Sequence, residues 1–347
     1  MPKAIHLIPY DGIGGVEVAA KAMADLNEPD FEFEVQYLFP DVKDRSARWA
    51  TFNPLRFIAA ARALWRQAPD VLIVSLWRCA IVGVIVRLLN RRTRLVVFLH
   101  NSADAHFVDW LCTRTALYLA DAVWSDSKAT ANGRLPSSLR HQSITISYLV
   151  NRLSPLQFDV APGPVFAFWG RLSPQKQLDR ALRLFALIRM ALPDARFRII
   201  GPDGGELEAL RSLADQLAIA AAVEFIGPLP FGEIPARVAG ASFFLQTSLY
   251  EGMCLSVTEA MQLGLVPVVT PVGEVGRYCV DGVNALVINE DEGAVVSEVV
   301  RLLGDVEAFR RVQRAAVETW SQQLRYKDSV LAAIRTILQR SAPLRGS

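Results

Sequence analysis

The stretch that decides the fold is residues 243–270, which read FFLQTSLYEGMCLSVTEAMQLGLVPVVT. It predicts a short strand at 243–246, a helix at 257–263 and a second strand at 266–270. Both strand segments are apolar at consecutive positions, which is typical of parallel strands that are buried on both faces. A strand–helix–strand unit of this kind indicates a parallel sheet covered by helices.

The same alternation continues along the chain in two series. The first predicts strands at 4–9, 71–76, 95–100 and 122–125, with helices at 16–26, 54–67, 81–90 and 107–119. The second adds strands at 165–169, 196–200 and 223–226, with helices at 178–190, 206–218 and 293–303. Two separate series favour two doubly wound, Rossmann-like α/β domains over one continuous sheet.

The break between the two series falls where proline and glycine interrupt the pattern. Residues 153–164 contain Ser154-Pro155 and Ala161-Pro162-Gly163-Pro164 and show no period. We therefore expect an N-terminal domain at 1–152, a linker at 153–164 and a C-terminal domain at 165–322. The tail, 323–347, has a helical pattern and is expected to pack back toward the N-terminal domain.

The composition excludes several classes of protein. Of 347 residues, 52% are hydrophobic and 21% are charged, which supports packed cores and excludes a disordered chain. The net charge of +2 argues against nucleic-acid binding through bulk charge. The four cysteines form no C-x-x-C pair, which argues against a disulfide framework and a structural zinc site. The most apolar run, 79–89, is interrupted by Arg87 and is too short to span a membrane, so a soluble, cytoplasmic protein is expected.

Polar or glycine-rich residues after a strand are the places to look for chemistry, because open parallel sheets bind ligands beyond the carboxyl ends of their strands. Gly12, Gly14 and Gly15 follow the first strand and open a helix, where backbone N–H groups suit a phosphate. The alternative is a tight turn, and the G-x-G-x-x-G spacing of dinucleotide sites is missing. His100 ends a strand and is either functional or structural. With His106 it forms no metal site, because no other ligand groups with the pair.

Two further segments carry opposite charges. Arg171 and Lys176 follow the strand at 165–169 and can face one point, a combination suited to a diphosphate, although solvated surface charge is the alternative. Glu251 lies in a loop and Glu259 in the opening turn of a helix, so both can accept hydrogen bonds from ligand hydroxyls. Two carboxylates are also the acid and nucleophile of some glycoside hydrolases, but that reading leaves the two cations without a role.

These segments resemble, in order and spacing, the retaining glycosyltransferases of family 4, which have the two-domain GT-B fold. Glu251 and Glu259 match the E-x7-E motif of that family. The resemblance extends to Gly14-Gly15-Val16-Glu17, His100, residues 120–127, Gly170-Arg171-Leu172 with Lys176, Phe225-Ile226-Gly227, and Glu259-Ala260-Met261 with residues 264–269. One departure is Cys254, which stands where the family's E-G-F-G has its second glycine, and another is Gly276-Arg277 in place of a proline and a glutamate.

The resemblance implies a role for each matched residue. Glu251 would bind hydroxyls of the donor sugar, Glu259 the ribose, and His100 the transferred sugar. Arg171 and Lys176 would neutralise the diphosphate. The remaining residues implied to bind the donor are Gly14, Gly15, Ile226, Gly252, Met253, Cys254 and Leu255. The family needs no metal or other cofactor, and its N-terminal domain binds the acceptor.

The sequence therefore predicts a glycosyltransferase that moves a sugar from a UDP- or GDP-linked donor to a glycan or lipid-linked acceptor, in assembly of cell-envelope polysaccharide. A sugar-nucleotide epimerase or hydrolase on the same fold, an NAD-dependent dehydrogenase and a non-catalytic sugar-nucleotide-binding subunit are the alternatives. Missing G-x-G-x-x-G spacing disfavours the dehydrogenase.

A second hypothesis concerns the membrane. Four arginines, at 87, 91, 92 and 94, lie beside the apolar helix 81–89, and residues 45–65 mix arginine with tryptophan and phenylalanine. Such a surface can rest on anionic lipid, which would make the protein peripheral on the cytoplasmic face of a membrane. A solvated helix face is the alternative.

Overall fold

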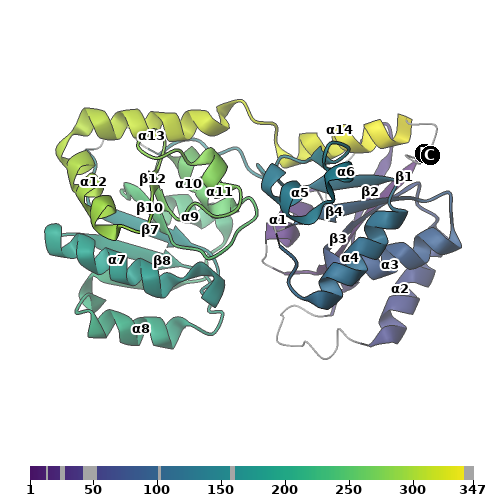
Figure 1. Cartoon of the computed structure of the whole chain (residues 1–347), viewed down its shortest axis with the longest axis horizontal. Helices are drawn as coiled ribbons and strands as arrows, with labels where there is room; N and C mark the ends of the chain where they lie inside the picture. The colour runs from purple at the N-terminus through teal and green to yellow at the C-terminus, as the bar shows by residue number, and fades with distance from the viewer. Residues whose placement is uncertain (13–14, 24–27, 42–52, 101–102, 157–160, 340–347) are drawn as a thin grey trace. The chain divides into compact units, whose positions relative to one another are not determined.

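The computed structural model describes residues 1–12, 15–23, 28–41, 53–100, 103–156 and 161–339. The chain divides into two compact units (Figure 1). The first unit comprises Met1–Val150 and the chain from Leu324 onward, and the second comprises Asn151–Gln323. Each unit is built on one six-stranded sheet in which all strand pairs are parallel. The prediction of two doubly wound α/β sheets is therefore confirmed.

The sheet of the first unit has the strand order β2-β1-β3-β4-β5-β6. Every residue of β3 is buried, as expected for a strand covered on both faces. The strands are β1 (Lys3–Tyr10), β2 (Glu32–Phe39), β3 (Val71–Ser75), β4 (Arg94–Leu99), β5 (Ala122–Ser125) and β6 (Ile144–Thr145).

Three long helices pack side by side on one face of this sheet, and the C-terminal helix α14 lies on the other (Figure 1). The three are α2 (Pro54–Gln67), α3 (Leu76–Leu89) and α4 (Phe107–Leu119). The other helices are α1 (Gly15–Lys21), α5 (Lys128–Arg134), α6 (Ser137–Arg140) and α14 (Tyr326–Gln339). Several contacts hold α14: among them, Arg335 pairs with Glu28 and Asp30 at 2.7 and 3.0 Å, and the ring of Tyr326 stacks on that of Phe98.

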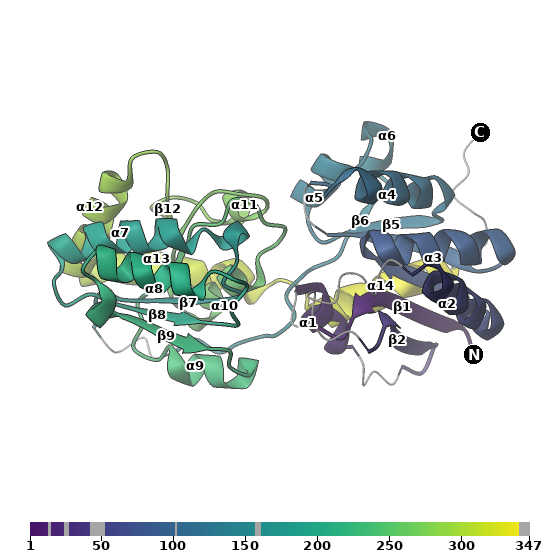
Figure 2. The same cartoon turned by 90° about the horizontal axis from the view of Figure 1, so that it is seen from below.

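The sheet of the second unit has the order β12-β11-β10-β7-β8-β9, and Figure 2 shows β7, β8 and β9 side by side. Its strands are β7 (Val165–Trp169), β8 (Arg196–Ile200), β9 (Val223–Gly227), β10 (Phe243–Gln246), β11 (Val266–Val269) and β12 (Leu286–Val287). Its helices are α7 (Leu178–Ala191), α8 (Leu207–Gln216), α9 (Ile234–Arg237), α10 (Leu255–Leu263), α11 (Val275–Tyr278), α12 (Glu292–Gly304) and α13 (Val306–Ser321). Three short 3₁₀ helices complete it: η2 (Pro174–Lys176), η3 (Ala220–Ala222) and η4 (Phe231–Glu233).

Three strands were not expected from the sequence: β2, β6 and β12. Strand β2 alternates Glu32 and Glu34 with apolar residues because it lies at the sheet edge, where one side of the strand meets water. The other two contain only two residues each, too few to show a period.

The structure describes residues 153–156 and 161–164 of the expected linker. These residues belong to the second unit, where Leu156 N–H donates to the Leu263 carbonyl at 2.9 Å and Gly163 N–H donates to Ser242 Oγ at 2.9 Å.

The strand order of the second unit reverses between β7 and β10, and open α/β sheets bind ligands beyond the carboxyl ends of the strands at such a point. Next to it, the loops after β7 and β8 are in close contact: Gly170 N–H donates to the Ile200 carbonyl at 2.9 Å. A Cβ at Gly201 would lie 1.8 Å from the Gly170 carbonyl oxygen, at a φ of +147°. This edge of the sheet can form only with glycine at 201.

We expect Gly201→Ala to destabilise the protein by about 2–5 kcal/mol, because the methyl group overlaps a backbone carbonyl and the backbone angle is strained. Urea unfolding measures this. Gly232→Ala is the control, since nothing lies within 4 Å of its Cβ position, and it should stay within about 0.5 kcal/mol of wild type. Equal stability of the two variants would contradict the close approach.

Candidate functional site

An ion pair joins the two loops that begin at the reversal point of the second sheet. Lys176 ends η2, after β7, and its Nζ lies 2.6 Å from Oε1 of Glu251, which follows β10. Both side chains are nearly buried, with exposures of 16% and 8%. Burial disfavours the charged ammonium, but the neighbouring Cys254 and Glu251 outweigh burial and raise the pKa of Lys176. The lysine therefore stays charged at the carboxyl edge, where parallel sheets bind ligands.

Further hydrogen bonds hold these two loops together. The Leu249 N–H donates to the Gln175 carbonyl at 2.9 Å, and the Gln175 side-chain amide donates to the Tyr250 carbonyl at 2.8 Å. Thr247 Oγ1 donates to the Gln177 carbonyl at 2.6 Å. The segments that carry Lys176 and Glu251 are thus fixed to each other through backbone as well as side chains.

Gln246, the last residue of β10, organises the carboxylate, and the sequence did not reveal it. Its Nε2 donates to Glu251 Oε1 at 3.1 Å and lies 2.8 Å from Cys254 Sγ. Its Oε1 accepts from Ser256 Oγ at 3.0 Å. Oxygen Oε1 of Glu251 is thereby shared by Gln246 and Lys176, whereas no residue within the described ranges is bonded to Oε2.

Glu259 lies inside α10 and is held by a different partner. Trp169 ends β7 and donates its indole Nε1–H to Glu259 Oε2 at 2.8 Å. Burial raises the pKa of Glu259 to about 7, although the tryptophan hydrogen bond lowers it in part. Its protonation therefore changes near neutral pH. Trp169 is a second functional candidate that the sequence analysis missed, since in the sequence it is one more apolar residue of a buried strand.

Arg171 lies half-buried in the same loop as Lys176. Within the described part of the chain its guanidinium makes no hydrogen bond or ion pair, so its donors are available to a ligand. The loop is fixed by backbone contacts: Leu172 N–H donates to the Pro202 carbonyl at 3.0 Å, and Gly204 N–H to the Leu172 carbonyl at 2.7 Å.

Residues 252–254 form the loop between Glu251 and α10. Tyr278 donates its hydroxyl to the Met253 carbonyl at 2.9 Å, and Glu274 N–H donates to the Gly252 carbonyl at 3.1 Å. Cys254 is buried and has φ +57° and ψ 82°, in the left-handed region that favours glycine. The loop therefore has the backbone expected for glycine, with cysteine in its place.

His100 lies in the first unit with a side chain that is 3% exposed. Its Nε2 lies 2.9 Å from Ser75 Oγ, which in turn lies 2.8 Å from Nε2 of His6. The Tyr148 hydroxyl lies 3.4 Å from its Nδ1. Burial, together with the nearby His6 and Arg134, holds the pKa of His100 well below its usual range, so the ring is neutral. Both ring nitrogens already have partners inside the unit.

The remaining predicted donor-binding residues are placed as follows. Gly15 is exposed at the first position of α1, and Gly14 lies outside the described residues. Ile226 is half-buried on β9, the strand at the edge of the second sheet and separated from β7 by β8. His106, considered above with His100, accepts from Asp109 N–H at 3.1 Å and caps α4. Among the described residues, no cluster of His, Cys, Asp and Glu is suited to hold a metal ion.

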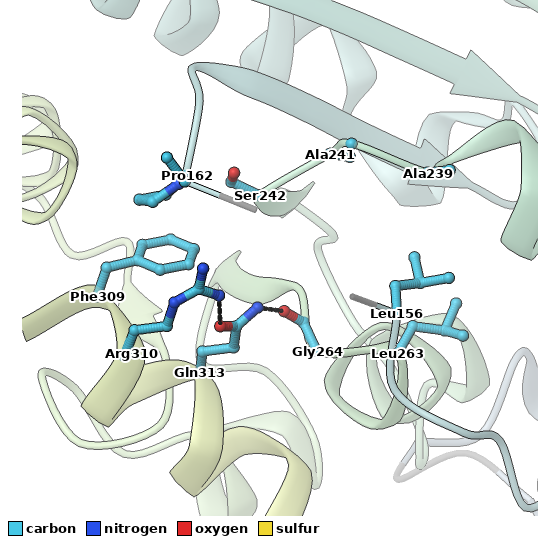
Figure 3. Close-up of a pocket in the computed structure, with 12 residues that line it drawn as sticks. Leu156, Pro162, Ala239, Ala241, Ser242, Leu263, Gly264, Phe309, Arg310 and Gln313 are labelled. Atoms are coloured by element: carbon cyan, nitrogen blue, oxygen red, sulfur yellow. Dashed lines mark hydrogen bonds between the residues drawn. The ribbon is translucent and has the colours of Figure 1, made fainter. Parts of the chain in front are cut away.

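The second unit also contains a cavity of about 260 Å³, which lies elsewhere (Figure 3). Ser242 and Gly264, which line it, precede β10 and β11, so the cavity lies at the amino ends of these strands. Arg310 donates to Gln313 at 2.6 Å, and Gln313 donates to the Gly264 carbonyl at 2.7 Å. Lys176 and Glu251 lie at the opposite edge of the sheet, so this cavity is not the candidate site.

The chain is similar in sequence to known glycosyltransferases over part of its length. The model of the family described as "Glycosyl transferases group 1" matches residues 159–318. The D-inositol 3-phosphate glycosyltransferase of Nocardia farcinica is 30% identical over 169 residues, which are 46% of this chain and 38% of that protein. The GDP-mannose:cellobiosyl-diphosphopolyprenol alpha-mannosyltransferase of Xanthomonas campestris is 26% identical over 51% of this chain and 49% of its own length. In these matches the chain spans less than half of each relative.

Solved structures are similar over nearly the whole chain. HepE of Anabaena, in complex with UDP, has a TM-score of 0.75 at 18% identity, covering 98% of this chain and 100% of HepE. Sucrose-phosphate synthase of Thermosynechococcus elongatus has a TM-score of 0.77 at 16% identity, covering 98% of this chain and 99% of that one. These structural similarities confirm the predicted GT-B fold, and the match to the glycosyltransferase family model covers residues 159–318.

The buried ion pair makes a prediction about stability. Lys176→Met should cost about 3–5 kcal/mol, because it leaves the Glu251 carboxylate buried without its cation. Adding Glu251→Gln should recover part of that loss, and urea unfolding of both single variants and the double variant measures the coupling. As a control, Arg301→Met breaks a half-exposed pair with Glu298 and should cost about 0–1 kcal/mol. A Lys176 variant as stable as the Arg301 variant would contradict the role of burial.

Proposed function

We propose that the chain transfers a sugar from a nucleoside-diphosphate sugar to a glycan or lipid-linked acceptor, with retention of configuration at the anomeric carbon. The observation that carries this proposal is the Lys176–Glu251 pair at the point where the strand order reverses. The loop of Lys176 also carries Arg171, whose guanidinium has no partner in the described chain. One loop thus supplies two cations and the facing loop supplies a carboxylate whose Oε2 is open to a ligand hydroxyl.

The chemistry of the reaction matches these charges. Cleavage of the bond between the anomeric carbon and a phosphate oxygen develops negative charge on the diphosphate and positive charge on the sugar ring. Arg171 and Lys176 stabilise the leaving group as its charge grows, which lowers the barrier more than it strengthens substrate binding. In this proposal the N–H groups at the start of α10, near Met253–Leu255, bind phosphate oxygens, together with Gly14 and Gly15. No metal is required, because arginine, lysine and the amides neutralise the diphosphate.

The two carboxylates take separate parts in this proposal. Glu251 binds hydroxyls of the donor sugar through Oε2, and Glu259 binds the ribose, with Ile226 near the nucleobase. A glycoside hydrolase would instead use them as acid and nucleophile, but Glu251 is neutralised by Lys176 and Glu259 is bonded to Trp169. An epimerase or hydrolase of the nucleotide sugar is the remaining alternative on this fold. His100 contacts the transferred sugar in our proposal through its backbone or ring edge, since its ring nitrogens are engaged.

The names of the relatives support an acceptor that carries a lipid or a glycan. One relative acts on a diphosphopolyprenol-linked cellobiose, according to its name. A lipopolysaccharide outer core galactosyltransferase, WaaB, has a TM-score of 0.69 at 18% identity over 97% of this chain. We propose that the first unit binds such an acceptor and that the protein works in cell-envelope polysaccharide assembly, at the cytoplasmic face of an anionic membrane. No helix in the described ranges has the length and apolar character to cross a bilayer.

Incubation with radiolabelled UDP- and GDP-sugars tests the function. Transfer of label to a polyprenol-linked or glycan acceptor is expected, whereas release of free sugar or an epimerised donor without acceptor would support the alternatives. Thermal-shift screening of the same donors identifies the one that binds, because a ligand of the folded state raises Tm. We propose that the acceptor hydroxyl attacks the anomeric carbon from the face that the diphosphate leaves, and that the departing phosphate takes the proton of the hydroxyl. A covalent glycosyl–enzyme adduct would contradict this direct attack.

Arg171→Gln should lower kcat by about 100–1,000-fold, because one of the two cations that stabilise the leaving group is lost. Steady-state kinetics with the identified donor measure this. Arg183→Gln, which removes an exposed arginine of α7, is the matched control and should keep wild-type kcat. If kcat is retained in the Arg171 variant, the leaving-group role is wrong.

Binding of the nucleotide sugar should depend on pH through Glu259. Its pKa of about 7 means that it is ionised at pH 8 and protonated at pH 6. Ribose hydroxyls donate to the ionised form, so affinity should fall about tenfold from pH 8 to pH 6. Calorimetric titration measures this, and Glu259→Gln should bind more weakly but without the pH dependence. Glu298→Gln, at an exposed position, should leave the wild-type profile unchanged. A pH dependence that persists in Glu259→Gln would assign it to another group.

A further inference from the structure

One helical face of the first unit differs in charge from the rest of the chain. Helices α2, α3 and α4 lie side by side, with α3 between the other two (Figure 1). Together they contain six arginines and a single acidic residue, Asp109. Asp109 is buried and paired with Arg134 at 2.9 Å, so the outer surface of this layer carries no carboxylate. In the second unit, by contrast, α12 and α13 carry Glu298 and Glu307 outside.

The same face exposes an unusual amount of apolar surface. Ten of the twenty large apolar side chains that are exposed in the described chain belong to these three helices. They are Leu55, Ile58 and Trp65 on α2, Leu88 and Leu89 on α3, and Phe107, Val108, Trp110, Leu111 and Tyr118 on α4. We call this set, with the arginines between them, the α2–α4 face. Contiguous apolar patches on a soluble surface mark sites of interaction.

The outer side of α4 is the most apolar part of this face. Phe107 is 71% exposed and Tyr118 is 87% exposed, at opposite ends of the helix. The rings of Phe107 and Trp110 stack on each other at 5.6 Å, so this pair forms one flat aromatic surface in the first turn. Leu111 lies beside them. Aromatic side chains of this kind prefer the boundary between lipid headgroups and acyl chains.

Arginines on α2 and α4 supply the charge. Arg62 and Arg66 are exposed on α2, Arg114 is half-buried on α4, and none of them is bonded to another described residue. Two arginines named for this role in the sequence analysis are engaged elsewhere: Arg87 pairs with Asp121 at 2.8 Å, and Arg94 donates to the Ile337 carbonyl. Arg45 and Arg48 lie outside the described residues. Arg91 and Arg92, which follow α3, are exposed. The available cations therefore lie on α2 and α4 and in the residues that follow α3.

We propose that the α2–α4 face docks on an anionic lipid bilayer, with the α4 aromatic residues in the interface and Arg62, Arg66 and Arg114 against the headgroups. The three helices expose no carboxylate, which suits an anionic surface because anionic lipid would repel a carboxylate there. The docking rests on the proposed function in one respect: its purpose is to bring the first unit to a lipid-linked acceptor.

Flotation with vesicles tests the docking. The wild-type chain should float with vesicles of phosphatidylcholine and phosphatidylglycerol, less with phosphatidylcholine alone, and less as salt is raised. The triple variant Phe107→Ser, Trp110→Ser, Leu111→Ser should lose binding by about tenfold or more, because its apolar anchor is removed. The double variant Arg62→Gln, Arg66→Gln should lose about fivefold for each arginine and show a weaker salt dependence.

A matched control removes exposed apolar residues elsewhere. Leu187 and Met190 on α7 are 41% and 82% exposed, and the variant Leu187→Ser, Met190→Ser should float like wild type. The proposal is overturned if the wild type does not float, or if the α4 triple variant floats as well as wild type. It is also overturned if the wild type is a dimer that the triple variant converts to a monomer, since the face would then join two copies.

Thermal shift with the nucleotide sugar separates this proposal from the proposed function. All variants of the α2–α4 face should keep the wild-type shift, which also shows that they fold. A wild type that floats but binds no nucleotide sugar would refute the function and leave the docking surface standing. A wild type that binds the nucleotide sugar but does not float would refute the docking alone.

Discussion

The structure of the second unit depends at its functional edge on one interaction, the ion pair between Lys176 and Glu251. Each charge alone would be costly to bury, and together they join the loops after β7 and β10 where the strand order reverses. Gln246 completes the arrangement by binding the same carboxylate oxygen that binds lysine. One oxygen of Glu251 is therefore held by two partners, whereas the other has no partner among the described residues.

Much of this site could be predicted because of the way parallel sheets are built. Every strand of the second unit ends at the same edge, so charged residues just after strands in the sequence gather there in space. That is why Lys176 and Glu251 could be named before their contact was known. Gln246 and Trp169 could not, because both are the last residues of buried strands and their roles depend on partners 5 and 90 residues away.

In the first unit, the sequence predicts the position of a candidate residue but not its surroundings. His100 was correctly expected at the end of a strand, yet its surroundings come from residues distant in sequence: Ser75, His6 and Tyr148. The single hydroxyl proton of Ser75 can be donated to only one of the two imidazoles, so the other must donate to the hydroxyl, and the two tautomers are coupled. Burial lowers the pKa of His6 to about 3, and the chain of partners stays neutral near pH 7. A sequence does not show which histidine is buried in such a chain.

The strained backbone at Cys254 and the side chain of Gln246 are linked by a hydrogen bond. A residue with a side chain at φ +57° costs of order 1 kcal/mol or more compared with glycine. The thiol offsets that cost here, since it accepts from the Gln246 amide at 2.8 Å and lies 3.5 Å from Ser256 Oγ. Glycine at 254 would relax the backbone and remove this contact, leaving Gln246 with one partner fewer, whereas Tyr278 and Glu274 would still hold Met253 and Gly252. The cysteine therefore adds a side-chain contact to a loop that backbone contacts already fix, and this contact reaches the glutamine that binds Glu251.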